Sequence, residues 1–235
     1  MKKIILSCCL SIVIILVIAL PSCEKDENNE EPADPINGTV QDIEGNVYPT
    51  VKIGNQWWMA ENLNTTKFRS GEDIPNVAGA GEWATTGEAA CCASANDPEN
   101  AEVYGRLYNW HAAADGRKIC PSGWHIPGDS DWTTLIEFLG GNEVAGSKLK
   151  QTGTVLWSAP NSDATNESGF TAIPGGVRNG NTGDFAGMGI NSSWWSATQQ
   201  NAENGFAWNV TSVNGFVAHY GVDKNTGMAV RCVKD

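Results

Sequence analysis

The segment between residues 177 and 210 combines tryptophan rings with amide, carboxylate and guanidinium side chains. Indole rings can stack on the C–H faces of sugars, while amide and carboxylate groups hydrogen-bond to hydroxyl groups. We therefore predict a ligand-binding surface, for a glycan or a protein, built from Trp57, Arg178, Asp184, Asn191, Trp194 and Trp208. The alternative is that Trp194 and Trp208 are core residues and that the Asn and Gly residues of the segment form turns.

Two patterns that would predict catalysis or metal binding are incomplete. Ser147 and Lys150 match the Ser-x-x-Lys pattern of serine acyltransferases, but the Ser-Asp-Asn and Lys-Thr-Gly elements that accompany it are missing. Residues 179–184 offer oxygen atoms at alternate positions, as calcium loops do, yet Ile190 stands where an EF-hand has a bidentate Glu. We predict a polar turn between strands there, and a domain without a catalytic residue, metal ion or cofactor.

The N-terminus has the features of an export signal. Lys2 and Lys3 precede an apolar stretch at residues 4–20, which is short for a transmembrane helix, since such a helix usually needs about 20 apolar residues. The Leu-Pro-Ser-Cys sequence that follows resembles a bacterial lipobox. We predict that residues 1–22 are a lipoprotein signal peptide and that Cys23 carries the lipid that anchors the protein to a membrane. A plain signal anchor is the alternative.

An acidic segment follows Cys23. Residues 24–35 contain six acidic residues, one basic residue and no large apolar side chain. This composition cannot bury enough apolar surface to fold, so we predict a disordered tether over residues 23–37. Its Lys-Asp-Glu run resembles the surface-export signal of Bacteroidetes lipoproteins. The predicted location is therefore the outer membrane, with the domain exposed on the cell surface.

The charge of the remaining chain limits the partners. Residues 36–235 contain 12 basic and 21 acidic residues, a formal net charge of −9. An acidic domain repels phosphate backbones, which argues against a nucleic-acid partner. Neutral glycans or a surface protein fit this charge better.

Four cysteines remain in the predicted domain: Cys91, Cys92, Cys120 and Cys232. In an oxidising compartment they allow three connectivities, and the spacing alone does not select one. We favour a disulfide between Cys120 and Cys232, because Cys91 and Cys92 are adjacent and share one loop. That adjacent pair would then form a strained vicinal disulfide or remain as two free thiols.

The predicted secondary structure mixes short strands with two helices, which indicates an α+β domain. Residues 39–59 predict a β-meander with a two-residue hairpin at Gly54-Asn55, in which Trp57 and Trp58 point to opposite faces. Residues 70–100 predict an irregular insertion. Apolar spacing predicts helices at 104–115 and 129–139, the second with Asp129 or Ser130 as its N-cap and Gly140-Gly141 at its end. Short strands are expected at 169–173, 193–198, 205–210, 215–220 and 228–233.

Several segments together resemble the Fibrobacter succinogenes major paralogous domain family. They are YPTVKIGNQWWMAENLN (48–64), YGRLYNWHAA (104–113), CPSGWHIPGDSDWTTL (120–135), GFTAIPGGVRNG (169–180), WWSAT (194–198) and VRCVKD (230–235). They occur in order across nearly the whole predicted domain, residues 38–235. The resemblance implies a cell-surface protein with a C-type-lectin-like fold, the class that includes the sulfatase-modifying enzymes. It also implies that the chain ends meet in a sheet, which supports the Cys120–Cys232 pairing.

These expectations combine into a surface lipoprotein whose domain is a non-enzymatic binding or adhesion module. Two alternatives remain open. A purely structural surface or pilus-associated protein would have all its tryptophans buried. An enzyme of the sulfatase-modifying (formylglycine-generating) class would have Cys91 or Cys92 folded against Cys232 as a reduced pair.

Overall fold

The computed structural model describes residues 36–235. The predicted signal peptide, the lipidation at Cys23 and most of the predicted tether lie outside the described residues. Strand β1 (Ile36–Gln41) begins ahead of the predicted domain start at residue 38. Within the described range no helix has the length and hydropathy needed to span a membrane.

The described residues form short helices and mostly antiparallel strands, so the predicted α+β class is confirmed. The helices are α1 (Ala80–Thr85), the 3-10 helix η1 (Ser94–Asn96), α2 (Pro98–Tyr104), α3 (Trp110–Ala113), α4 (Asp129–Phe138) and α5 (Asn142–Leu149). The further strands are β2 (Val47–Ile53), β3 (Gln56–Met59), β4 (Cys91–Ala93), β5 (Arg106–Tyr108), β6 (Trp124–His125), β7 (Val177–Arg178), β8 (Phe185–Ala186), β9 (Asn191–Gln199), β10 (Asn204–Thr211), β11 (Val217–Asp223) and β12 (Val233–Lys234).

A five-stranded sheet joins the two ends of the described chain. Its strand order is β1-β2-β3-β12-β6, so the last strand lies between the N-terminal meander and β6. The predicted hairpin at Gly54-Asn55 is confirmed, because Ile53 pairs with Gln56. The predicted disulfide joins Cys120 to Cys232 with 6.0 Å between their Cα atoms. It ties the segment before β6 to the segment before β12.

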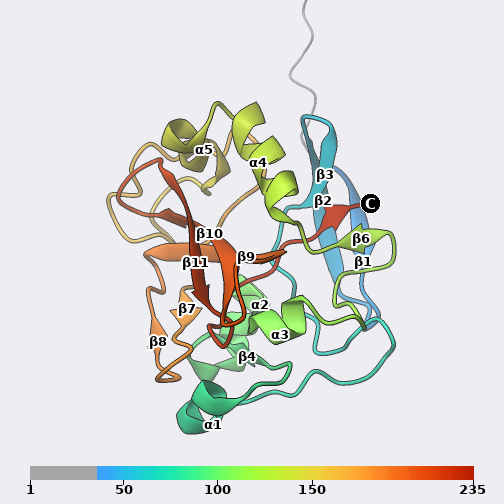
Figure 1. Cartoon of the computed structure of the whole chain (residues 1–235). Coiled ribbons are helices and arrows are strands. Elements are labelled where there is room, and N and C mark those ends of the chain that lie inside the picture. Colours follow the sequence, from blue (N-terminus) through green and yellow to red (C-terminus); the bar gives the residue numbers. More distant parts are fainter. Residues whose placement is uncertain (1–35) are drawn as a thin grey trace, which may run out of the picture. The chain divides into compact units, whose positions relative to one another are not determined.

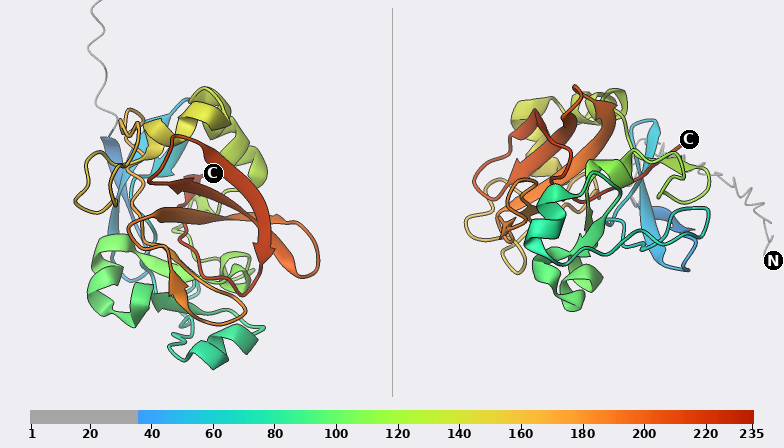
Figure 2. Two further views of the ribbon diagram at one scale, coloured as in Figure 1. Left: turned by 90° about the vertical axis from the view of Figure 1, so that its left-hand side faces the viewer. Right: turned by 60° about the horizontal axis from the view of Figure 1, so that its bottom comes forward.

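A three-stranded sheet of order β11-β10-β9 lies on the other side of the domain (Figures 1 and 2). Successive side chains of a strand point to opposite faces. One face carries Trp194, Trp208 and Val210, which share a core cluster with buried residues of α4 and α5. Figure 1 shows these two helices above the sheet. On the opposite face, Trp195 and Ala207 pack into another core cluster, and the rest of that face lines the groove described below.

The predicted helix at 129–139 is confirmed as α4, with Trp132, Leu135 and Ile136 buried. Its N-terminus differs from the prediction: the N-cap is Gly128 rather than Asp129 or Ser130. The Asp131 carboxylate accepts the Gly128 N–H at 2.9 Å, which satisfies a backbone donor that the helix leaves unpaired.

The predicted helix at 104–115 is wrong over most of its length. Tyr104 ends α2, Gly105 has φ +72°, and residues 106–108 form β5, leaving only the short helix α3. Strand β5 pairs with β4, which lies in the segment predicted to be an irregular insertion. The helix-like spacing of apolar residues in 104–111 therefore belongs to a segment in which a short strand lies between two short helices.

The later part of the chain agrees with the predicted strands at 193–198, 205–210 and 215–220. Residues 169–173 contribute only one isolated bridge, and residues 228–233 contribute only isolated bridges at Met228 and Ala229 and the first residue of β12. The predicted polar turn at 179–184 is confirmed, because it connects the paired strands β7 and β8.

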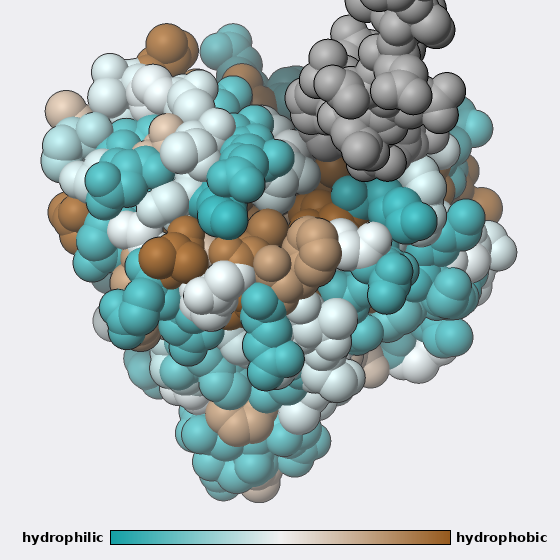
Figure 3. Space-filling model, turned by 90° about the horizontal axis from the view of Figure 1, so that it is seen from above, coloured by the Kyte–Doolittle hydropathy of each residue, from teal (hydrophilic) through white to brown (hydrophobic). Residues whose placement is uncertain are grey.

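The surface of the domain on the side of α4 and α5 carries hydrophobic residues near its centre, with hydrophilic residues around them (Figure 3).

Candidate functional site

Two of the predicted ligand-binding tryptophans belong to the core. Trp194 is 1% exposed and Trp208 is 5% exposed. Both rings pack against Trp132 of α4. The ring centroid of Trp194 lies 5.7 Å from that of Trp132, and the ring centroid of Trp208 lies 6.1 Å from it. Such distances are typical of packed aromatic pairs. The prediction that these two rings stack on a ligand is therefore corrected, and the core alternative holds for both.

Arg178 is also unavailable to a ligand. The side chain is fully buried. Its guanidinium donates to the carbonyl oxygens of Val77 (2.6 Å), Ala78 (2.8 Å) and Gly183 (2.8 Å), and lies 4.5 Å from the ring centroid of Trp83. These contacts join the loop before α1 to the hairpin of β7 and β8. Arg178 therefore stabilises the insertion rather than forming a surface site.

The remaining predicted residues are separated. Asp184 is exposed in the turn between β7 and β8, where its carbonyl accepts the Asn179 N–H at 2.8 Å. Trp57 is half-buried on β3, in the other sheet, and packs against a core cluster there. Of the six predicted residues, only Asn191 lines the groove described next. The predicted single surface is therefore not assembled.

The face of the three-stranded sheet that points away from α4 carries, beside its buried part, a groove of about 360 Å³, which we name the sheet groove. Its walls come from β7 and the turn after it, from β8 to β11 and from the loop after β11. The lining residues are Val177, Asn179, Gly180, Asn181, Ala186, Asn191, Ser193, Asn209, Tyr220, Val222, Asp223, Thr226 and Met228. Most of these are amide, hydroxyl or carboxylate residues, and one is aromatic.

Strand register explains why these residues share one face. Asn209 is opposite Ser193, and Ala207, two residues before Asn209, is opposite Tyr220. Positions two apart on a strand point to the same face. The side chains of Ser193, Asn209 and Tyr220 therefore project together, while Trp208 projects toward α4.

Tyr220 is the aromatic side chain that the groove presents, and it is 37% exposed. Burial raises the pKa of Tyr220, so its hydroxyl stays neutral and can both donate and accept a hydrogen bond. Asn209 is held in place because its amide donates to Ser193 Oγ at 2.9 Å and to the Ser192 carbonyl at 3.1 Å. The groove thus combines an exposed ring with fixed polar groups.

Sequence reasoning missed Ser193, Asn209, Tyr220 and Asp223. The signal was present for the first three, because they alternate with core residues in segments that were predicted as strands. Asp223 is the last residue of β11, beyond the predicted strand at 215–220, and no local pattern marks it.

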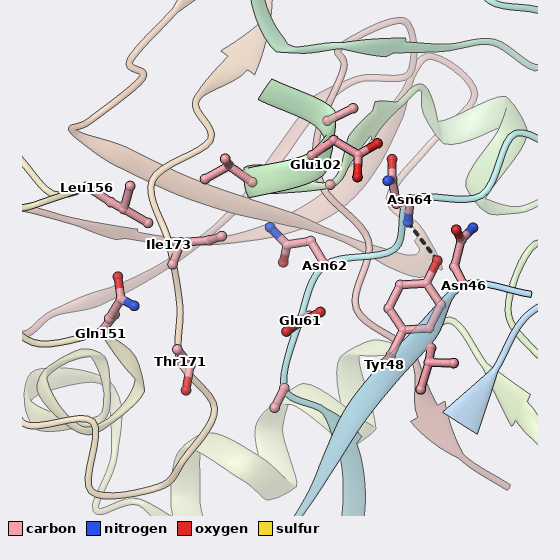
Figure 4. A pocket seen from close by; sticks show the side chains of 15 residues that line it. Asn46, Tyr48, Glu61, Asn62, Asn64, Glu102, Gln151, Leu156, Thr171 and Ile173 are labelled. Carbon is pink, nitrogen blue, oxygen red and sulfur yellow. Dashed lines mark hydrogen bonds between the residues drawn. The ribbon is translucent and has the colours of Figure 1, made fainter. Parts of the chain in front are cut away.

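A second cavity of about 350 Å³ lies between the end of the N-terminal meander, α2 and the loops around Gln151 and Thr171 (Figure 4). We name it the amide cleft. Its lining includes Asn46, Asn62, Asn64, Gln151, Glu61, Glu102, Tyr48 and Thr171, with Val47, Val103, Leu156 and Ile173 among the apolar residues. None of these residues was predicted to form a site.

Asn62 fixes the floor of the amide cleft. Its oxygen accepts Trp194 Nε1 at 2.9 Å and Arg231 Nη2 at 3.0 Å, and its nitrogen donates to the Tyr104 carbonyl at 2.9 Å. Arg231 is fully buried, and burial lowers its pKa to about 9. The floor is therefore a hydrogen-bonded unit in which all Asn62 polar groups have partners.

Cys91 and Cys92 are buried free thiols, which resolves the two alternatives left by the sequence. They lie on β4, so their side chains enter different core clusters. Burial raises the pKa of Cys91 to about 12 and that of Cys92 to about 11. A thiol with such a pKa is a poor nucleophile at neutral pH.

We expect iodoacetamide to leave Cys91 and Cys92 unlabelled in the native protein and to label both in guanidinium chloride without reductant. The reason is their burial together with their raised pKa values. Peptide mass spectrometry measures the labelling, and Cys120 and Cys232 should become labelled only after reduction. Rapid native labelling of Cys92 would contradict the described burial.

No group of three or more His, Cys, Asp and Glu side chains in residues 36–235 is arranged to hold a metal ion. No curated protein and no solved structure matches the chain. The family model of the Fibrobacter succinogenes major domain matches residues 51–234, and these residues include the sheet groove, the disulfide and most of the residues that line the amide cleft. The chain therefore belongs to the Fibrobacter succinogenes major domain family.

Proposed function

We propose that the domain is a non-enzymatic glycan-binding module whose site is the sheet groove. The observation that carries this proposal is the exposed ring of Tyr220 on the same face as Asn191, Ser193 and Asn209. Aromatic rings stack on sugar C–H faces, and amide and hydroxyl groups bind sugar hydroxyls. A volume of about 360 Å³ lies within the usual range for small-ligand sites.

The charge of the groove favours a neutral glycan. Asp223 lines it, and its lining includes no Lys, Arg or His. Lys224, the next residue, is buried and donates to the Ala202 carbonyl at 2.7 Å. Because the field of an acidic protein repels polyanions, nucleic acid is excluded from the proposed ligands.

The proposal includes the setting of the domain. We propose a lipoprotein anchored through Cys23 in the outer membrane, exposed on the cell surface, with a C-type-lectin-like fold. The supports are the lipobox-like sequence, the acidic segment after it and the meeting of β12 with the N-terminal meander. A surface protein is the second ligand class that this setting would offer.

We expect replacement of Tyr220 by Ala to weaken glycan binding about tenfold, because the stacking surface is lost. A neutral-glycan array, followed by titration of the best ligand with the full-length protein, measures this effect. Phe216→Ala is the matched control, since Phe216 is also an exposed aromatic residue but does not line the groove. An equal loss in both variants, or no glycan bound by the wild type, would overturn the proposal.

A purely structural surface protein is the alternative that one observation favours. Eight of the ten tryptophans are buried, and Trp57 and Trp110 are half-buried against the core. The sulfatase-modifying alternative expects Cys91 or Cys92 to lie against Cys232 as a reduced pair. This pair is not formed, because Cys232 is bonded to Cys120. The glycan titration separates the binding module from the structural protein.

A further inference from the structure

The sheet groove has an apolar part beside its polar groups, which we name the apolar notch. Val177 and Val222 form it, are half-buried and pack against a core cluster that contains the buried Met228. All three residues line the groove, so the groove reaches the edge of the hydrophobic core. A ligand that carried only hydroxyl groups would leave this notch in contact with water. The notch therefore favours a ligand that brings a methyl group.

Asn209 presents a hydrogen-bond acceptor to the groove. Its Nδ2 donates to Ser193 Oγ at 2.9 Å and to the Ser192 carbonyl at 3.1 Å, so both amide hydrogens are used. Its Oδ1 atom receives no hydrogen bond from a described residue, and it is not one of the fully buried polar atoms. Asn209 can therefore only accept a hydrogen bond from a ligand.

Asn179 presents the opposite group. Its Oδ1 atom accepts the backbone N–H groups of Asn181 at 2.8 Å and of Thr182 at 3.1 Å, which holds the side chain in the turn between β7 and β8. These two bonds use both lone pairs of the oxygen. Its Nδ2 group makes no hydrogen bond with a described residue and is exposed. Asn179 lines the same groove, where it can only donate.

A fixed acceptor and a fixed donor together complement a secondary amide, whose N–H donates and whose carbonyl accepts. An acetamido group is such an amide, and it ends in a methyl group that suits the apolar notch. We propose that the sheet groove selects glycans that contain an N-acetylated sugar. The acetamido N–H binds Asn209 Oδ1, its carbonyl binds Asn179 Nδ2, and its methyl group lies in the apolar notch. This inference rests on the proposed glycan-binding function, because it names the sugar class for the same groove.

Tyr220 and Asp223 limit the class further. The exposed ring of Tyr220 is the stacking surface for the sugar ring that carries the acetamido group. Asp223 is the charged residue of the lining, so an N-acetylated sugar that also carries a carboxylate is repelled. The expected ligand is therefore a glycan with a neutral N-acetylhexosamine.

The test compares neutral disaccharides that differ only in the group on the second carbon of the sugar ring. N,N′-diacetylchitobiose has acetamido groups where cellobiose has hydroxyl groups, and N-acetyllactosamine and lactose form a second pair. We expect the full-length protein to bind the acetamido member of at least one pair at least about tenfold more tightly than its counterpart, measured by calorimetry.

The outcomes separate this inference from the proposed function. Equal affinities within each pair, or binding only of array glycans that have no acetamido group, would overturn the N-acetyl assignment and leave glycan binding in place. No binding to any glycan of the array would overturn both. Equally strong competition by Nα-acetylglycine methylamide, which has the amide and the methyl group without a sugar ring, would assign the groove to a peptide and also overturn the inference.

Matched variants assign the contacts. Asn179→Asp keeps the oxygen that holds the turn but removes the donor, and it should weaken binding of the acetamido sugar about tenfold. Asn201→Asp is the control, because Asn201 Oδ1 also accepts two backbone N–H groups, those of Glu203 and Asn204, but lies outside the groove. Val222→Thr puts a hydroxyl in the apolar notch and should weaken binding about fourfold. Equal effects of the two Asp variants, or equal losses for both sugars of a pair, would overturn the assignment.

Discussion

Replacing Cys120 and Cys232 together by Ser is expected to lower the free energy of unfolding by about 4 kcal/mol, because the disulfide closes a long loop. The two residues are 112 positions apart and both are buried. The bond restricts the unfolded chain, and it fastens the segment before β12 to the segment before β6. Urea unfolding followed by tryptophan fluorescence measures the change.

Reduction of the wild type is the first control for this prediction. A reductant should destabilise the wild type by a similar amount and leave the double variant unchanged. Cys91→Ala serves as a second control, since it removes a buried thiol from the same core cluster without touching the bond. A double variant as stable as the wild type, or peptides that link Cys120 to Cys91, would contradict the assignment.

Trp132→Ala should cost about 4 kcal/mol of folding free energy, because it empties the centre of an aromatic cluster. The ring of Trp132 lies 4.9 Å from Trp58, 5.7 Å from Trp194 and 6.1 Å from both Trp208 and Phe170, measured between centroids. No rearrangement of α4 alone can refill that space. Thermal and urea unfolding, monitored by circular dichroism, measure the loss.

Two phenylalanine variants test the reason for this loss. The Trp132 Nε1 atom has no partner among the described residues, so Trp132→Phe removes no hydrogen bond and should cost less than about 1.5 kcal/mol. Trp194→Phe should cost more, because it removes the donor to Asn62 Oδ1 at 2.9 Å. Equal losses in the two variants would show that ring volume alone decides the stability.

Sequence reasoning correctly predicted the parts of the fold that depend on the local sequence, such as turns and amphipathic helices. The Gly54-Asn55 hairpin follows from turn chemistry, and the α4 helix follows from apolar spacing and its Gly140-Gly141 end. By contrast, residues 104–111 have the spacing of a helix but contain β5. That strand depends on pairing with β4, and such a non-local contact leaves no mark in the local sequence.

The sheet groove shares a chain segment with the predicted ligand-binding surface, but only Asn191 of the predicted residues lines it. Asn191 and Trp194 are three positions apart on β9, so they point to opposite faces of the sheet. A surface that combined them could not form on a regular strand. Applying the alternation to residues 191–220 would have separated Trp194 and Trp208 from Asn191, Asn209 and Tyr220. The amide cleft could not be predicted, because it joins five separate segments of the chain.

The position of β12 inside the five-stranded sheet has a consequence for the order of folding. Its pairing partners are β3 and β6, while β12 itself contains the second-last residue of the chain. The sheet therefore remains in two unjoined parts until β12 has been synthesised, and a nascent chain that lacks β12 cannot bury the surfaces that this strand covers. Contacts of such large sequence separation also form slowly. Folding of the domain is therefore completed only after β12 has joined the two parts of this sheet.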